Sequence, residues 1–176
     1  MENLMKVYAK LLAANPHIVI AGSLSLKIQG IKIPREPKDV DVMLPRGTTF
    51  NSCIEGLKYN HDSEDNGYFN DEYYRSQWEL YGVKVDVFER MSTEWSPRTV
   101  YCDVWMSDHF EKRKCVHWSE VLRQKTLYAF AYHVSALKHI DDVCRIIHLN
   151  KYSKWHWFLY RVLKPIHKFV NVFRRK

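Results

Sequence analysis

The chain has 176 residues, of which 46% are hydrophobic and 27% charged, a composition that suits one folded domain and excludes a wholly disordered chain. Its net charge of +7 comes from residues 151–176, which contain eight Lys or Arg and no acidic residue, while the remainder is nearly neutral. No apolar run reaches the ~20 residues that cross a bilayer, and the first residues lack the pattern of a signal peptide.

The four cysteines form no Cys-x-x-Cys pair. In a chain of this size their irregular spacing predicts free thiols rather than a disulfide framework. We therefore expect a cytoplasmic protein.

The first elements in chain order are an amphipathic helix over residues 2–14 and a short strand over residues 17–21. Gly22-Ser23 then turns the chain into a helix over about residues 24–29. Gly22 permits a ligand to approach the backbone closely, and Ser23 can offer its hydroxyl and N–H groups to phosphate. The alternative is an ordinary strand-to-helix turn with Ser23 as the N-cap.

Two later segments alternate with the period of a β-strand. Residues 38–44 place Asp39 and Asp41 on one face, and residues 83–89 place Asp86 on one face together with Lys84. If the two strands are neighbours, three carboxylates converge, and such mutually repelling groups need a cation between them. Two divalent metal ions with oxygen ligands are the usual solution. The alternative for the first segment is an edge strand with a solvated acidic face.

The remaining pattern is less regular. Residues 58–77 have the weakest periodicity, and the acidic stretch 61–67 within them indicates a solvated loop. The other expected elements are a helix over 48–57, a hairpin of strands 73–80 and 83–89, a loop over 91–98, a strand over 99–106, and helices over 118–130 and 136–149.

The ordered set Gly22-Ser23, Asp39-Val40-Asp41 and Asp86 resembles the nucleotidyltransferase fold. The short form resembles the minimal nucleotidyltransferases of bacterial toxin–antitoxin and abortive-infection systems, with lincosamide-modifying enzymes as a nearby group. The resemblance covers roughly residues 17–145. It implies an α/β (α+β) fold, a small mixed sheet flanked by helices. We expect a catalytic core over 1–117, a helical part over 118–150 that packs on it, and a C-terminal helical segment over 151–176.

The resemblance also implies roles for individual residues. Asp39, Asp41 and Asp86 would hold two Mg²⁺ ions, with Mn²⁺ as the alternative ion, and Asp86 would favour deprotonation of the acceptor hydroxyl. Residues expected to bind the nucleotide, its phosphates above all, are Gly22, Ser23, Lys38 and Lys125, together with Asp142. The usual loop arginine is present as Arg35, and Lys38 stands where a Ser or Thr is often found.

Three assignments in the helical part stay open on the residues alone. Lys125 is either a ligand for triphosphate oxygens, which makes it part of the catalytic set, or an exposed helical lysine. Asp142 fits the family spacing better than Asp141. His139, whose counterpart in the abortive-infection group is often acidic, is either catalytic or structural.

The function that this pattern favours is transfer of a nucleoside monophosphate from an NTP, such as ATP, to a hydroxyl of an RNA or tRNA end, a protein or a small molecule. The alternative is a binding module without chemistry, for example an antitoxin that inhibits a partner toxin. Retention of all three carboxylates favours the enzyme. For the tail 151–176 three interpretations compete: packing on the domain, RNA binding by its aromatic and basic residues, and contact with a membrane surface.

Overall fold

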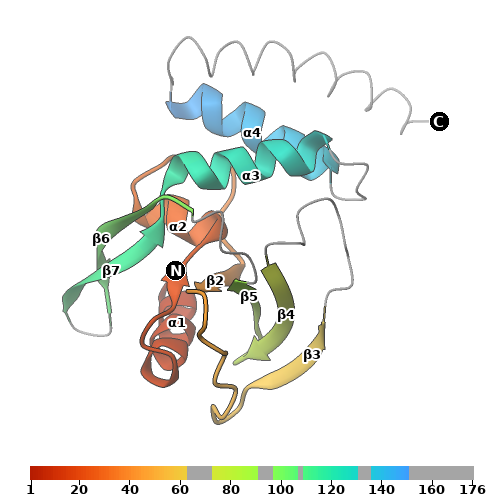
Figure 1. Ribbon diagram of the computed structural model, residues 1–176. Helices are drawn as coiled ribbons and strands as arrows, with labels where there is room; N and C mark the ends of the chain where they lie inside the picture. The colour runs from red at the N-terminus through yellow and green to blue at the C-terminus, as the bar shows by residue number, and fades with distance from the viewer. Residues whose placement is uncertain (63–72, 91–96, 107–108, 131–135, 151–176) are drawn as a thin grey trace.

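The computed structural model describes residues 1–62, 73–90, 97–106, 109–130 and 136–150 (Figure 1). The expectations for the tail 151–176 and for most of the acidic stretch 61–67 lie outside these residues. The described elements, in chain order, are α1 (Glu2–Ala14), β1 (Val19–Ile20), α2 (Gly22–Ile28), β2 (Asp39–Leu44), β3 (Lys58–Asp62), β4 (Tyr73–Leu80), β5 (Val83–Arg90), β6 (Thr99–Trp105), β7 (Phe110–Val116), α3 (Trp118–Phe130) and α4 (Ala136–Asn150).

The strands form one mixed sheet in the order β3-β4-β5-β2-β1-β7-β6. The pairs β2–β5 and β1–β7 are parallel, and the other four neighbouring pairs are antiparallel. The expectation of an α+β fold with a small mixed sheet is confirmed. The central position of β2 and β5 places the two aspartate-bearing strands side by side.

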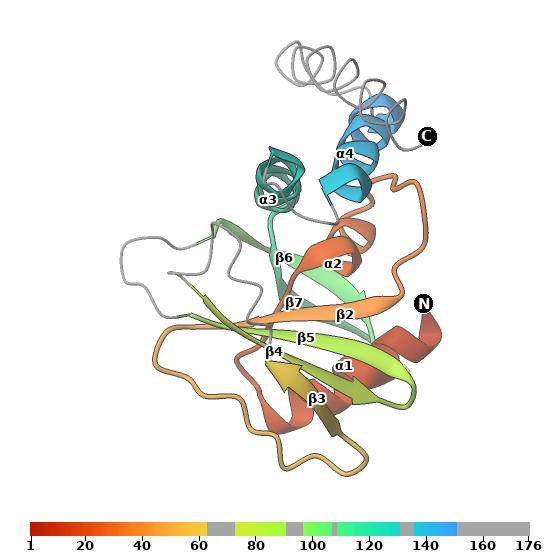
Figure 2. The ribbon, with the colours of Figure 1, turned by 90° about the vertical axis from the view of Figure 1, so that its right-hand side faces the viewer.

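One face of the sheet is covered by α1, as Figure 2 shows. The buried stripe of α1 includes Val7, Tyr8 and Leu11, and it meets the buried valines at positions 40 and 42 of β2 and at 85 and 87 of β5. Burying a side chain of this size contributes about 2 kcal/mol. Because neighbouring residues of a strand face opposite ways, packing these valines against α1 turns the aspartates of both strands to the other face.

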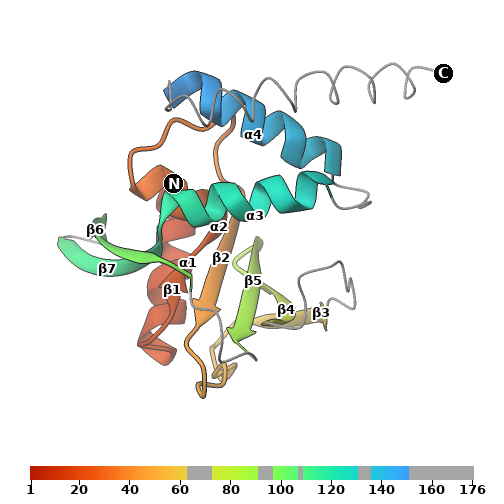
Figure 3. The same cartoon turned by 45° about the horizontal axis from the view of Figure 1, so that its top comes forward.

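The second face carries α2, α3 and α4 (Figures 2 and 3). Their apolar side chains form a second core cluster with Met43 of β2 and Val116 of β7, and Phe88 packs at its edge. These helices therefore cover one part of the face that bears the aspartates. Strands β3 and β4 lie beyond them.

The prediction of a helix over residues 48–57 is wrong, because these residues form turns and irregular backbone. Side chains from distant segments bind backbone groups of this segment and fix its irregular path. The Phe50 N–H donates to Glu89 Oε1 at 2.7 Å, and the Asn51 N–H donates to Asn15 Oδ1 at 2.7 Å. Asn15 Nδ2 in turn donates to the carbonyl of Asn51 at 3.1 Å. Tertiary hydrogen bonds have outweighed local propensity here.

Two strands have no counterpart among the expected elements, β3 and β7. In β7 all four residues at positions 111–114 are charged, and buried residues appear only at Cys115 and Val116, so the sequence shows no apolar period of two. The strand forms because it pairs with β6 along its whole length and with β1 at Cys115. Within the described residues, no helix is both long enough and apolar enough to span a membrane.

Candidate active site

The three aspartates predicted to converge lie together on the face of the sheet that carries α2, α3 and α4. In the parallel β2–β5 pair Asp41 is directly opposite Asp86, and Asp39 is two residues before Asp41 on the same face. One carboxylate oxygen from each residue lies within 4.8 Å of the corresponding oxygens of the other two. Among the His, Cys, Asp and Glu residues that the structure describes, these three form the group that is close enough together to hold a metal ion.

The clustering has an electrostatic cost that falls on Asp41. Burial, followed by the charges of Asp39 and Asp86, raises the pKa of Asp41 to about 7. Charges from Lys125 and Arg75 act in the opposite direction but do not compensate. A carboxylate in this position releases its proton readily only when a further positive charge arrives.

Gly22 makes the position of Asp41 sterically allowed. Its φ is +57°, and a Cβ atom added there would lie 1.7 Å from Asp41 Oδ2. The preceding N–H, from Ala21, donates to the Asp41 carbonyl at 2.8 Å. Helix α2 begins at Gly22 with Ala21 as its N-cap and no side-chain capping bond. The alternative of Ser23 as N-cap is therefore wrong, and Ser23 lies in the first turn of the helix, half-buried.

Asp86 supplies a test of whether this site fits a metal ion. Its Oδ2 accepts from Arg75 Nη2 at 3.0 Å and lies 3.3 Å from Lys84 Nζ. Its Oδ1 is buried and has no hydrogen-bond partner. A buried carboxylate oxygen without a donor is costly, and a hard divalent cation bound by several oxygens is the partner that such a group accommodates. The donor set and the orphaned oxygen therefore fit Mg²⁺.

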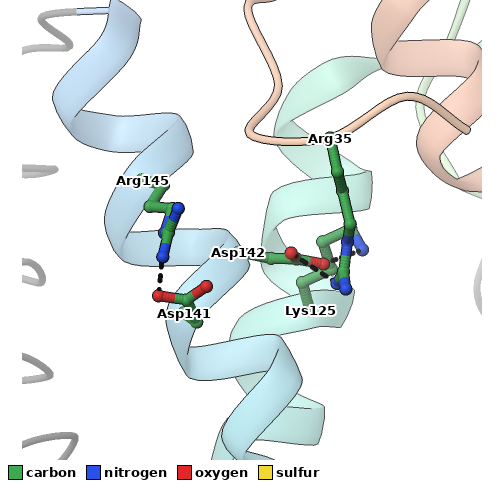
Figure 4. Close-up of polar contacts among 5 residues, drawn as sticks. All are labelled: Arg35, Lys125, Asp141, Asp142 and Arg145. Atoms are coloured by element: carbon green, nitrogen blue, oxygen red, sulfur yellow. Dashed lines mark hydrogen bonds and ion pairs between the residues drawn. The ribbon is translucent and has the colours of Figure 1, made fainter.

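A second charged cluster lies at the helices (Figure 4). Asp142 of α4 accepts from Arg35 Nη2 through Oδ1 at 2.6 Å and from Lys125 Nζ through Oδ2 at 3.0 Å. Burial alone would raise the pKa of Asp142, but the charges of Lys125 and Arg35 together lower it below its usual value. The side chain of Lys125 is only 12% exposed, so the interpretation of Lys125 as an exposed lysine is wrong.

The two adjacent aspartates of α4 have different partners. Asp141 pairs with Arg145 at 2.9 Å, one turn along the same helix and away from α3. Asp142 joins α4 to α3 and to the loop before β2. Both of its oxygens bind protein cations, so Asp142 holds Lys125 and Arg35 in place, and its contact with the nucleotide stays a prediction. Lys38 is exposed just before β2, and His139 is half-buried on α4.

Arg75 is a site residue that the sequence analysis missed. The signal for it was present in the hairpin turn. Tyr81 and Gly82 both have positive φ, at 52° and 73°, as the tight two-residue turn of a hairpin requires. Such a turn pairs Leu80 with Val83 and so places Arg75 opposite Phe88, diagonal to Asp86. The Arg75 guanidinium lies 5.7 Å from the centre of the Phe88 ring.

Comparison with known proteins gives structural neighbours only. No protein-family model matches the sequence, and no curated protein matches it. Among solved structures, the chain is similar to ANT(2″)-Ia, an aminoglycoside nucleotidyltransferase solved in complex with adenylyl-2″-tobramycin, at 14% sequence identity and a TM-score of 0.61. The match covers 94% of this chain and 99% of that one. A candidate nucleotidyltransferase from H. pylori matches at 15% identity over 98% of this chain and 95% of its own, with a TM-score of 0.37.

At these identities the first likeness is one of fold, and the second is too distant to add to it. The first likeness agrees with the sequence pattern, which predicted that a strand, the Gly22 turn and the paired aspartates of the next strand follow one another. The chain therefore has the nucleotidyltransferase fold.

Proposed function

We propose that this protein is a metal-dependent nucleotidyltransferase, which moves a nucleoside monophosphate from an NTP to a hydroxyl group of an acceptor. One observation carries the proposal. Asp39, Asp41 and Asp86 present oxygens within 4.8 Å of one another, beside a glycine that alone leaves room for the Asp41 carboxylate. The nucleotidyltransferase fold supports it. We propose Mg²⁺ as the metal ion and a cytoplasmic location.

The residues around the cluster divide the work. Asp39, Asp41 and Asp86 would hold two divalent ions, which when bound supply charge neutralisation at the triphosphate and polarise the acceptor hydroxyl. Gly22 lies against Asp41, and Gly22 and the adjoining Ser23 would face the phosphates. Lys125, held by Asp142, contributes positive charge near Asp41. Arg35, 48% exposed in its side chain, is free to turn one edge of its guanidinium towards an incoming nucleotide.

In the reaction, the acceptor oxygen forms a bond to the α-phosphorus of the NTP. The bond from that phosphorus to the oxygen bridging to the β-phosphate breaks, and pyrophosphate leaves with the bonding electron pair. The hydroxyl proton is drawn towards Asp86 and passes to solvent. The catalytic contribution of the protein is thus mainly positioning and charge compensation.

The test is transfer of label from each of four α-³²P-labelled NTPs, in Mg²⁺, to total RNA, cell lysate or a small hydroxyl compound. We expect a labelled product with the parent protein and none with Asp41→Asn. Asp103→Asn, which changes an exposed aspartate on β6, is the matched control and should leave transfer unchanged. Metal-dependent transfer that survives Asp41→Asn would contradict the proposed role, and absence of transfer with every NTP and acceptor would favour a binding module.

A further inference from the structure

The strand side of the metal cluster carries its own pair of cations. Arg75 from β4 and Lys84 from β5 both lie within ion-pair distance of the same oxygen, Asp86 Oδ2. Their side chains are 30% and 44% exposed, whereas that of Asp86 is 5% exposed. The two cations therefore reach from solvent down to a buried carboxylate.

This side of the cluster is distinct from the side that carries the nucleotide-binding elements proposed above. Gly22 begins α2, and Asp142 of α4 binds both Lys125 of α3 and Arg35 of the loop before β2. We call this the helical side; Arg75 lies on β4, which pairs with the edge of β5 away from β2. An NTP held on the helical side leaves the β4–β5 side for the acceptor. An acceptor hydroxyl that reaches Asp86 from this side passes beside Arg75 and Lys84, because both contact Asp86 Oδ2.

The charge balance on this side changes when a metal ion binds. In the metal-free protein Asp86 is the counter-ion of both cations. Once its carboxylate also neutralises a divalent ion, Arg75 and Lys84 are left with less compensation. Glu79, which is opposite Lys84 in the β4–β5 register, is the acidic residue of β4 on this face. Among the described residues of β4 and β5 on this face, two cations then lie beside one carboxylate outside the metal cluster, an arrangement that attracts an anion and repels a polyamine.

We propose that Arg75 and Lys84 select an acceptor that carries a phosphate group close to the reacting hydroxyl, as the 3′ end of an oligonucleotide does. This inference depends on the proposed function. It distinguishes this chain from its structural neighbour in complex with adenylyl-2″-tobramycin, because an aminoglycoside is a polyamine with positive charge near its hydroxyls.

Three acceptors separate the possibilities: a trinucleotide with a free 3′-hydroxyl, adenosine, which has the same hydroxyl without phosphate, and tobramycin. The trinucleotide is short, so it reports on charges near the hydroxyl. In the parent protein we expect kcat/KM for transfer to the trinucleotide to exceed that for adenosine and for tobramycin by about tenfold or more, which corresponds to two modest charge contacts.

The variant that tests the two side chains is the double substitution Arg75→Gln with Lys84→Gln. We expect it to reduce kcat/KM for transfer to the trinucleotide by about tenfold or more and to leave KM for the NTP unchanged. The difference in kcat/KM between the trinucleotide and adenosine should become smaller. Lys84→Gln alone, at an exposed position, should show part of the effect if the double variant folds poorly. The matched control is Lys112→Gln, since Lys112 is an exposed lysine that also pairs with an aspartate, Asp103 at 3.5 Å, on the far end of the sheet.

Four outcomes would overturn the inference. If the parent uses tobramycin or adenosine as well as the trinucleotide, the proposed function stands and the acceptor class is wrong. Likewise, a variant that labels the trinucleotide as the parent does removes Arg75 and Lys84 from selection. An equal loss with all three acceptors means that the two cations only position Asp86. Transfer to no acceptor, with no Mg²⁺-dependent binding of NTP, overturns the proposed function together with the inference.

Discussion

Two buried aspartates on either side of the site, Asp142 and Asp86, each hold two cations, but they hold them differently. At Asp142 one oxygen binds Arg35 and the other binds Lys125. At Asp86 both Arg75 and Lys84 approach Oδ2, and Oδ1 has no hydrogen-bond partner. Both side chains are only 5% exposed, so burial does not explain the difference.

The difference separates a carboxylate that supports the structure from one that is prepared for a ligand. Asp142 has a complete set of partners, and its pKa is lowered accordingly. Asp86 has one satisfied oxygen, which orients the group, and one oxygen left for an incoming cation. Removing the Asp142 carboxylate should therefore lower mainly the stability of the protein, and removing the Asp86 carboxylate should lower mainly its activity.

The largest effect is expected for Asp86→Asn. The substitution removes the charge that would bind the metal and draw the hydroxyl proton, so transfer should fall by about a thousandfold or more. The fold should persist, because Arg75 and Lys84 are partly exposed and can turn to solvent. Label transfer and circular dichroism measure the two effects. Retention of a tenth of the parent activity would show that Asp86 is not essential.

Gly22→Ala should come next. A Cβ would overlap Asp41 Oδ2 at 1.7 Å, and φ is +57°, so both the side chain and the backbone oppose the change. We expect a loss of about 2–3 kcal/mol in the free energy of unfolding, together with loss of activity as Asp41 is displaced. Gly47→Ala is a useful control, since Gly47 has a similar φ of +78° but open space around it. Equal losses in both variants would attribute the effect to the backbone alone.

Asp142→Asn should lower the free energy of unfolding by about 1–3 kcal/mol at pH 7. The loss is moderated because Arg35 is half exposed. Since the folded-state pKa of Asp142 is below its usual value, its stabilising contribution is complete above about pH 4 and disappears as the pH falls through the lowered pKa. Urea titrations of parent and variant should therefore differ at pH 7 and converge at low pH. A constant difference would rule out the charge pair as the cause.

The smallest effect, and one of opposite sign, is expected for Asp41→Asn in metal-free protein. The pKa of Asp41 is about 7 in the folded state against an ordinary value of 3.8. Between these values the folded protein holds a proton that the unfolded chain has lost, so stability falls as the pH rises through this window. The variant should match the parent below about pH 4, and its advantage should grow as the pH rises through the window, to about 1 kcal/mol or more at pH 8.

Adding Mg²⁺ should reverse this order, because the ion stabilises the folded parent that binds it and not the variant. Thermal melts with and without Mg²⁺ at pH 8 provide the measurement. A metal-free variant that is clearly less stable than the parent at pH 8 would show that the three carboxylates do not repel one another.

Local pattern was sufficient for the chemistry-bearing strands. The strict alternation in residues 39–44 and 83–89 placed each aspartate on a defined face, because the period of a strand depends only on backbone geometry. The helices over 2–14, 118–130 and 136–149, and the hairpin that contains Asp86, followed from similar short-range signals. The helix predicted over 48–57 failed because Asn15 and Glu89, distant in sequence, hold its backbone groups.

The tertiary structure decided which groups meet. Parallel pairing sets Asp41 opposite Asp86, and no local pattern specifies which strand lies beside which. The ion pairs of Asp142 with Lys125 and Arg35 required the packing of α4 on α3 and the return of the loop that carries Arg35. Arg75 reaches Asp86 only across a strand pair. Sequence by itself determined which side chains could share a face, since that is a property of a few consecutive residues. Their distances and their ion-pair partners depend on contacts between remote segments, and only the folded chain determines those.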